Sequence, residues 1–372
     1  MRSGRLGVLL FLVLMLIATI WWLFSCRNAW LTEIGSLGPD EPIRALAIFD
    51  DGSGPSLYAG GFFDHFGEEP ASRIARWDGR TWHGLGSAFN GTILSMIAFD
   101  DGTGPALYVA GNFTENRSRR ARHIARWDGE HWSRVGEGFN DWVYALAVYD
   151  HGAGPALYAG GAFTRSGNVE TPHIARWDGT HWQPVGEGLD GTAKALGSIN
   201  SGDLAGLYAG GDFSGHFARW DGERWEMPGG GTDGTVVTID AIGDGSLRGV
   251  YLGGRFSGHI ARWDGSELAP LNGGANREVL AIHVVDRGEQ SSVYAAGRFE
   301  RVGEISARRL ASWDGSQWQE VGGGVDERIA AMVLMPREAD ARCPGERLVV
   351  AGDFERVGRR ASAMIAIRRI AN

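Results

Sequence analysis

A repeat of about 50 residues is the feature that most limits how this chain can fold. A Gly-x-Phe triplet, in which x varies, marks each copy, and its glycine returns at steps of 50, 50, 50, 43, 43 and 55 residues. Periods of this size are typical of solenoids and propellers, in which each unit buries its apolar face against the next. The seven marker glycines are Gly61, Gly111, Gly161, Gly211, Gly254, Gly297 and Gly352.

Two tryptophans recur in the chain with the same period. The first ends an Ile-Ala-Arg-Trp segment in most copies, and an Asp-Gly pair follows it directly. The second lies five residues after the first, except where Leu268 takes its place. The first tryptophans are Trp77, Trp127, Trp177, Trp220, Trp263 and Trp313, and the second are Trp82, Trp132, Trp182, Trp225 and Trp318.

Four short strands are predicted in each copy. In the third copy they are residues 143–149, 157–163, 173–177 and 182–186, which are apolar or alternating runs between turn residues. The pair Asp178-Gly179 predicts a two-residue hairpin turn, because it accepts the positive φ that such a turn needs. Seven copies of four strands, with no sustained helical period, predict an all-β, seven-bladed β-propeller of four-stranded blades over residues 27–372.

The two chain ends predict how the ring closes. The last copy stops at residues 365–370, in the position of a third strand, and residues 30–35 match the fourth strand at residues 132–136. The N-terminal segment is therefore expected to complete the last blade as its outermost strand, which leaves no open edge. In that arrangement the Asp-Gly hairpins lie on the face at which the N-terminal segment enters.

Residues 1–26 predict a signal peptide or a membrane anchor. Arg2 and Arg5 precede an uncharged run, residues 6–24, that is long enough to span a bilayer. The two positive charges orient the run so that the rest of the chain is exported. The ending Leu23-Phe24-Ser25-Cys26 resembles a bacterial lipobox and predicts lipidation of Cys26, with an uncleaved anchor helix as the alternative. Both alternatives place the propeller in the cell envelope, outside the cytoplasm, with the Asp-Gly hairpins toward the membrane.

Cys343 is the only other cysteine. It lies in the long first hairpin of the last copy, on the face where Cys26 is expected. Without lipidation of Cys26, a disulfide between the two cysteines would staple the ring in an oxidising compartment. With lipidation, Cys343 is a lone thiol.

The charge of the chain argues against a nucleic-acid partner. The net charge is −9, and the chain has no basic block. Phosphate contacts need clustered lysines and arginines. No sequence motif for a cofactor or a metal ion is found in the repeats, so none is expected.

The repeat motifs resemble those of a known family. Leu-Tyr-Ala-Gly-Gly-x-Phe at residues 157–163, Ile-Ala-Arg-Trp-Asp-Gly and Trp-x-x-Val-Gly-x-Gly are similar to the repeats of the fungal cortical-marker-for-cell-polarity family. Similar repeats occur in secreted bacterial propellers, and the period overlaps that of kelch-like propellers. The resemblance covers about residues 30–372. It implies a surface protein and supplies no catalytic residues.

Polar residues that return in most copies are predicted to serve architecture. Four histidines at one repeat position are expected to lie too far apart for zinc and predict a hydrogen bond at a strand edge. Turns that begin with two acidic or polar residues lack the further carboxylates of a calcium loop. The arginine before the first tryptophan predicts contacts with the neighbouring blade. These residues are His123, His173, His216 and His259; residues 50–52, 100–102 and 150–152; and Arg76, Arg126, Arg176, Arg219 and Arg262.

Positions that differ between copies are better candidates for function. In the first strand, Asp240 and His283 hold equivalent positions in adjacent copies, where the other copies have small or apolar residues. A carboxylate beside a histidine can orient it for acid–base catalysis near the channel mouth. The alternative is a hydrogen bond between blades that serves structure alone.

The middle residue of Gly-x-Phe is charged in four consecutive copies. The four residues are Asp212, Arg255, Arg298 and Asp353. They predict a charged arc that binds a polar ligand on the face away from the membrane. The alternative is ion pairing between blades.

Two loops after the second strand carry unusual side chains. Aromatic residues crowd the first loop, and arginines crowd the next. Aromatics beside arginines predict a recognition patch, with an ordinary solvated loop as the alternative. The residues are Phe62, Phe63, His65 and Phe66, and Arg117, Arg119, Arg120 and Arg122.

Two functions from different classes follow from these observations. The first is a non-enzymatic scaffold that binds a protein or an envelope polysaccharide, because the repeated residues have architectural explanations. The second is a carbohydrate hydrolase or lyase that uses Asp240 and His283. The fold itself does not choose between them, since propellers serve both classes.

Overall fold

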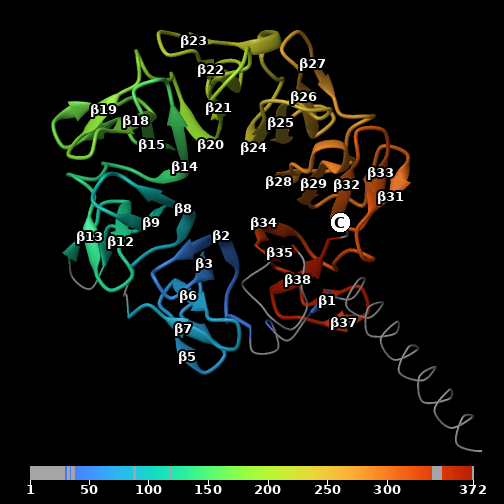
Figure 1. Ribbon diagram of the computed structural model, residues 1–372, viewed down its shortest axis with the longest axis horizontal. Coiled ribbons are helices and arrows are strands. Elements are labelled where there is room, and N and C mark those ends of the chain that lie inside the picture. The colour runs from blue at the N-terminus through green and yellow to red at the C-terminus, as the bar shows by residue number, and fades with distance from the viewer. Residues whose placement is uncertain are drawn as a thin grey trace, which may run out of the picture.

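Seven four-stranded antiparallel sheets surround a central axis in the computed structural model, like the blades of a propeller (Figure 1). The structure describes residues 30–31, 34, 38–86, 89–116, 119–336 and 346–370. Helical structure in these residues is limited to short 3-10 turns, among them η2 (Pro228–Gly230) and η3 (Gly288–Gln290). The predicted all-β, seven-bladed fold is confirmed.

The predicted signal or anchor segment, residues 1–26, lies outside the described residues, and so do Cys26 and Cys343. In the described part of the chain, no helix is long and apolar enough to cross a membrane. The anchor, the lipidation and the alternative disulfide therefore stay predictions.

The strands of each blade are given in order from the axis outward. Blade 1 has β2 (Ile43–Asp50), β3 (Pro55–Gly61), β6 (Ile74–Trp77) and β7 (Trp82–Gly84); blade 2 has β8 (Ile93–Asp100), β9 (Pro105–Gly111), β12 (Ile124–Trp127) and β13 (Trp132–Arg134); blade 3 has β14 (Val143–Asp150), β15 (Pro155–Gly161), β18 (Ile174–Trp177) and β19 (Trp182–Pro184). Blade 4 has β20 (Thr192–Ile199), β21 (Gly206–Asp212), β22 (Phe217–Trp220) and β23 (Trp225–Glu226); blade 5 has β24 (Val236–Ile242), β25 (Gly249–Gly254), β26 (Ile260–Trp263) and β27 (Leu268–Pro270). Blade 6 has β28 (Val279–Val285), β29 (Ser292–Gly297), β32 (Leu310–Trp313) and β33 (Trp318–Glu320); blade 7 has β34 (Ile329–Met335), β35 (Arg347–Gly352), β38 (Ile365–Arg369) and β1 (Trp30–Leu31).

The ring closes as the sequence predicts. Strand β1 pairs with β38, so that Trp30 lies opposite Arg368 as the outermost strand of blade 7. The indole Nε1 of Trp30 donates to the carbonyl of Gly322 in blade 6 at 2.9 Å. Trp182 makes the same kind of contact with the carbonyl of Val135, at 3.2 Å, between blades 3 and 2. Trp30 is thus the second repeat tryptophan of blade 7.

The hydrophobic core lies between the blades. In the described chain, seven clusters of buried residues each combine side chains from two adjacent blades. One cluster joins the first blade to the last, with Leu57 and Phe63 packed near Val349 and Ile367. Stability therefore depends on neighbouring blades, because one blade alone cannot bury its faces.

A side-chain clamp ties the linker before each first strand to the loop after the second strand. In blade 3, Asn140 Oδ1 accepts the amides of Thr164 and Arg165 at 2.9 and 3.0 Å. An Asp or Asn at the equivalent position accepts an amide of this loop in every blade, although in blades 4 and 5 its second contact is a serine hydroxyl and not a second amide. The seven residues are Asp40, Asn90, Asn140, Asp190, Asp233, Asn276 and Asp326. The side-chain oxygen of an Asp or Asn can accept backbone amides, and in blade 3 it joins segments that are 24 residues apart.

Blades 4 and 5 differ from the rest in the loop after the second strand. Five blades place an additional two-stranded hairpin there, and the 43-residue steps correspond to blades that lack it in the described chain. These hairpins are not predicted from the sequence. They are β4 (His65–Phe66) with β5 (Glu69–Pro70), β10 (Glu115–Asn116) with β11 (Arg119–Arg120), β16 (Arg165–Ser166) with β17 (Val169–Glu170), β30 (Arg301–Val302) with β31 (Ile305–Ser306), and β36 (Arg356–Val357) with β37 (Arg360–Ala361).

Candidate functional site

The ring has two faces that differ in the elements they expose. On the linker face, each first strand begins and each second strand ends, so the Gly-x-Phe residues lie there. On the hairpin face lie the turns between the first and second strands and the Asp-Gly turns between the third and fourth. The innermost strands β2, β8, β14, β20, β24, β28 and β34 surround the axis (Figure 1).

A β-bulge interrupts every innermost strand near its start, at the linker face. In blade 1 the register shifts between Ile43 and Ala45, so that Arg44 is the additional residue. A bulge redirects a side chain and is common beside functional sites. The seven additional residues are all partly exposed, and they differ in kind: Arg44, Leu94, Tyr144, Lys194, Val237, Leu280 and Ala330.

Four arginines share two carboxylates on the linker face. Glu278 lies 3.2 Å from Arg255 Nε and 3.3 Å from Arg298 Nε. Asp353 lies 2.5 Å from Arg328 Nε and 3.5 Å from Arg44 Nη1. We call Arg44, Arg255, Glu278, Arg298, Arg328 and Asp353 the charged rim.

The contacts of the charged rim run both within and between blades. Arg255 reaches from blade 5 to Glu278 of blade 6, and Asp353 of blade 7 reaches Arg44 of blade 1. Burial, and then the nearby charge of Arg328, lower the pKa of Arg44 despite the attraction of Asp353. The structure therefore places three of the four predicted arc residues in two ion-pair groups, one at Glu278 and one at Asp353. These groups contain the predicted alternative, ion pairs between blades.

Asp212, the fourth residue of the predicted arc, has different partners. Its carboxylate pairs with Lys194 Nζ in its own blade and accepts from the hydroxyl of Thr235 in blade 5. The side chain of Asp212 is 47% exposed. Burial raises the pKa of Tyr144, and the charges of Asp141 and Asp212 raise it further, which links blade 3 to this end of the arc.

Exposed aromatic side chains occupy the same level of the linker face in blades 1 and 3. Phe62 is 48% exposed and Trp142 is 41% exposed, although most large apolar side chains of the described chain are buried. The rings of Trp142 and Tyr144 lie 5.9 Å apart, and the guanidinium of Arg73 lies 4.6 Å from the ring centre of Phe62. We call Phe62, Trp142 and Tyr144 the aromatic rim.

The predicted patch around Phe62 is smaller than expected. Phe63 and Phe66 are buried, and Phe66 stacks on Trp82 with ring centres 4.0 Å apart. They are core residues because the additional hairpin of blade 1 packs against its outer strand. The assignment of these two phenylalanines to a recognition patch is wrong. Arg117 of the neighbouring loop lies outside the described residues.

Asp240 and His283 meet, as the sequence analysis anticipates. His283 Nδ1 lies 3.3 Å from Asp240 Oδ2, and the two side chains are 28% and 32% exposed. The carboxylate also accepts the amides of Ala241 and Val284, both at 2.8 Å. Because Val284 belongs to the next blade, Asp240 makes the hydrogen bond between blades that is the structural alternative to a catalytic role. The side chains of Asp240 and His283 are still partly exposed.

The four repeated histidines close a turn in each of their blades. All four have a left-handed backbone, with φ between 58° and 73°. Their Nδ1 atoms lie 2.9–3.2 Å from the carbonyl of the marker glycine, so a ring N–H donates to that oxygen. The predicted strand-edge hydrogen bond is confirmed. In the described residues, no group of three potential metal ligands is found.

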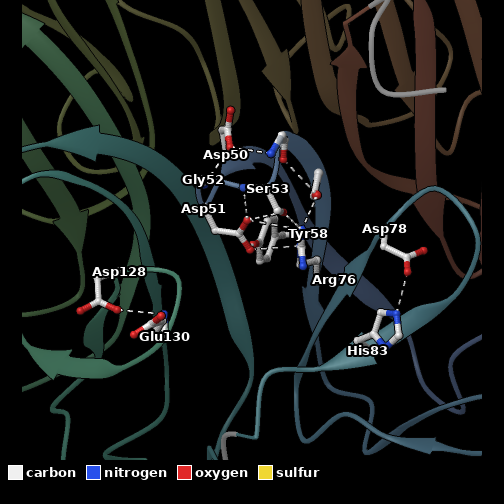
Figure 2. A network of polar contacts seen from close by, with 12 residues as sticks. Asp50, Asp51, Gly52, Ser53, Tyr58, Arg76, Asp78, His83, Asp128 and Glu130 are labelled. Atoms are coloured by element: carbon white, nitrogen blue, oxygen red, sulfur yellow. Dashed lines mark hydrogen bonds and ion pairs between the residues drawn. The ribbon is translucent and has the colours of Figure 1, made fainter. Parts of the chain in front are cut away.

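The first hairpin of blade 1 carries a polar network on the hairpin face (Figure 2). Asp50 Oδ1 accepts the amides of Gly52 and Gly54 at 2.9 Å each, which confirms the predicted tight turn. Asp51 Oδ2 accepts from the hydroxyl of Tyr58 at 3.2 Å and lies 3.3 Å from Arg76 Nε. The network is repeated in blade 2, where Asp101 accepts from Tyr108.

The repeated arginines have partners in their own blade. Arg126 donates to the carbonyl of Gly104 at 3.0 Å, and Arg262 donates to the carbonyl of Arg248 at 3.2 Å. The prediction that they contact the neighbouring blade is wrong. Arg262 lies opposite Tyr251 in the sheet, and its guanidinium extends along that ring to the first hairpin of the same blade.

A cavity of about 670 Å³ lies at the outer edge between blades 1 and 2. Leu85, Trp127 and Trp132 line it, together with Asn116. None of its lining residues is a predicted site residue, and most are apolar or belong to the repeat. The rims near the axis remain the better candidate site, because they combine exposed charge with exposed aromatic surface.

No protein-family model and no curated protein matches the chain. Among solved structures, the chain is similar to BBS1N in its complex with ARL6DN, with a TM-score of 0.58, 11% identity, and coverage of 93% of this chain and 98% of that one. It is also similar to the extracellular domain of a putative hybrid two-component system from B. thetaiotaomicron, with a TM-score of 0.54, 12% identity, and coverage of 93% and 40%. Identities this low show the propeller fold alone. The resemblance to the fungal family stays a prediction that the repeat motifs carry.

Sequence reasoning missed several residues of the candidate site. Arg44 and Lys194 are the bulge residues of their strands. Glu278 and Arg328 are the residues directly before the first residue of strands β28 and β34. The signal that could have found them is the same one that found Arg255: these positions carry charge in some copies and apolar residues in others. The bulge itself has no sequence signature here, because its residues share no chemistry.

Proposed function

We propose that this chain is a binding module of the cell envelope, tethered to the membrane by its N-terminal segment, and that its linker face binds a protein or a polysaccharide. The observation that carries the proposal is the charged rim, in which four guanidinium groups share two carboxylates. Arg255 and Arg298 keep side-chain exposures of 61% and 50% despite these pairs. Exposed arginines and aromatics are enriched where proteins bind partners.

The orientation of the ring supports this choice of face. Strand β1 begins at the hairpin face, so a tether ahead of Trp30 approaches from that side. The linker face then points away from the membrane, where an envelope ligand has free access.

A retention experiment tests the proposal. The full chain, solubilised in mild detergent and immobilised, is incubated with solubilised envelope from the source cell. We expect a specific protein or glycan to be retained, and we expect the double variant Arg255→Ala/Arg298→Ala to retain about tenfold less, since each removes a charge-assisted contact. The matched control is Arg80→Ala/Arg224→Ala, which removes two exposed arginines from the hairpin face. Equal retention by both double variants, or none by the wild type, would overturn the proposal.

One observation favours a second function. Asp240 and His283 are in contact and partly exposed near the axis, which suits an acid–base histidine. A hydrolase or lyase of this kind would turn over envelope polysaccharides, and Asp240→Ala would abolish the turnover. Activity that persists in Asp240→Ala would exclude this pair as the catalytic group.

A further inference from the structure

We infer that the linker face binds an acidic polysaccharide, whose carboxylates contact the charged rim and whose sugar rings pack on the aromatic rim. The inference rests on the proposed binding function and names the class of its ligand.

The charge of the charged rim selects an anion. Its four arginines exceed its two carboxylates, although the whole chain has a net charge of −9. Each guanidinium has five N–H donors, and each carboxylate of the rim is divided between two of them. Carboxylates from a ligand would occupy the remaining donors in planar, charge-assisted pairs, a geometry for which arginine is better suited than lysine.

The spread of the arginines selects a ligand with several charges. Arg255 belongs to blade 5, Arg298 to blade 6, Arg328 to blade 7 and Arg44 to blade 1. The four residues therefore follow the rim across consecutive blades, and they pair with two different carboxylates, Glu278 and Asp353. A polymer with a carboxylate on successive units matches this arrangement.

The aromatic rim selects sugar rings over other carriers of carboxylates. The exposed ring of Trp142 pairs with the partly buried ring of Tyr144, and Phe62 adds a second exposed ring in blade 1. A pyranose has a face of C–H bonds that packs on an aromatic ring by dispersion, while its hydroxyls remain available for hydrogen bonds. Asp212, Lys194 and Thr235 lie between Tyr144 and Arg255 and offer such polar contacts.

The path between the two rims crosses the two short blades. Blades 4 and 5 lie between Trp142 of blade 3 and Arg298 of blade 6, and they are the blades without the additional hairpin. A polymer that contacts both rims therefore meets no hairpin from these two blades.

A pair of polymers that differ only in charge tests the inference. The full chain in detergent is titrated with polygalacturonate and with the same polymer after complete methyl esterification. We expect the acidic polymer to bind at least about tenfold more tightly, with an affinity that falls as salt is added. Arg298→Ala and Arg328→Ala should each weaken binding of the acidic polymer about tenfold. Trp142→Ala should weaken it as well, while Arg224→Ala on the hairpin face should have no effect.

Three results would overturn the inference, and they bear differently on the proposed function. Equal binding of both polymers would show a glycan site that ignores charge, which leaves the proposed function in place. Equal binding of polyglutamate, with no effect of Trp142→Ala, would show a site for acidic polypeptides. Binding of neither polymer would exclude acidic glycans, and the envelope retention experiment would then decide separately whether the linker face binds anything. Thermal melting of each variant shows that a loss of binding does not reflect unfolding.

Discussion

The hairpin face of this ring and the part of the linker face near the axis are built from different kinds of residue. On the hairpin face the same contacts return in blades 1 and 2: Asp100 Oδ1 accepts two glycine amides as Asp50 does, and Asp101 accepts from a tyrosine as Asp51 does. Near the axis on the linker face, the position of Arg255 is Phe62 in blade 1 and Ala162 in blade 3.

The difference between repeated and variable positions distinguishes residues that hold the ring together from residues that can bind a ligand. A contact that every blade needs cannot depend on a ligand that meets only a few blades, so repeated residues are expected to hold the ring. Side chains that differ at one repeat position are free of that requirement. The rims are therefore where selection for a ligand can act without weakening the fold.

The largest effect is expected for a repeated tryptophan. Trp182 is 1% exposed, packs between blades 2 and 3, and donates to the carbonyl of Val135. Trp182→Ala should lower the free energy of unfolding by about 3–5 kcal/mol, measured by denaturant titration. The matched control is Trp142→Ala on the aromatic rim, which should change stability by no more than about 0.5 kcal/mol. Similar losses in both variants would contradict the division between the faces.

A repeated aspartate should have the next largest effect. Asp101 Oδ2 accepts from Tyr108 at 2.8 Å and from Trp177 of the next blade at 3.1 Å. Asp101→Ala leaves both donors without this acceptor and should cost about 1–3 kcal/mol of unfolding free energy. Asp212→Ala on the linker face removes an equally charged but half-exposed carboxylate and should cost less than about 1 kcal/mol. An equal cost at both positions would show that the linker face is also architectural.

The smallest expected effect is a change in how the stability of the protein depends on pH at acidic pH. The amides of Glu267 and Ser266 and the hydroxyl of Ser266 lower the pKa of Asp264 to about 2. In Asp78, burial raises the pKa, but the amide of Thr81 and the side chain of His83 outweigh it and lower the value to about 2.

Both folded-state pKa values lie below 3.8, the ordinary value for an aspartate, so the native state binds fewer protons than the unfolded state. Their stabilisation is complete above about pH 4 and is lost as the pH falls toward about 2. The double variant Asp78→Asn/Asp264→Asn should therefore show a flatter decline of melting temperature over this range. Arg298→Ala should show the same decline of melting temperature with pH as the wild type. An unchanged decline in Asp78→Asn/Asp264→Asn would refute this role of the hairpin turns.

The sequence predicts the ring better than the rims, for a physical reason. Trp30 could be recognised as a displaced fourth-strand residue, because the run from Trp30 to Gly35 matches the fourth strands of other copies with one additional residue, and its contact with Gly322 confirms that. The charge at Arg255 and Asp353 was visible as a departure from the repeat. Spacing alone could not show that Arg44 is a bulge residue or that it shares Asp353 with Arg328.

The wrong predictions have a similar cause. The repeat shows that Arg262 and its equivalents serve structure, but not that a side chain of this length stays over its own sheet and reaches the first hairpin. Phe66 looks like a loop residue by position, and only the additional hairpin makes it part of the core. The local sequence pattern predicts the strand or turn in which a residue lies. Which residues its side chain contacts depends on how far that side chain extends.

The most direct test of the central claim removes two arginines from each face in turn. Arg255→Ala/Arg298→Ala changes the linker face, and Arg126→Ala/Arg262→Ala changes the hairpin face, with the same loss of charge. Both variants are measured for retention of envelope material and for thermal melting. We predict that the first variant loses retention about tenfold and melts as the wild type does, while the second retains envelope material at low temperature and melts earlier. A linker-face variant that melts earlier, or a hairpin-face variant that loses retention while folded, would contradict the account.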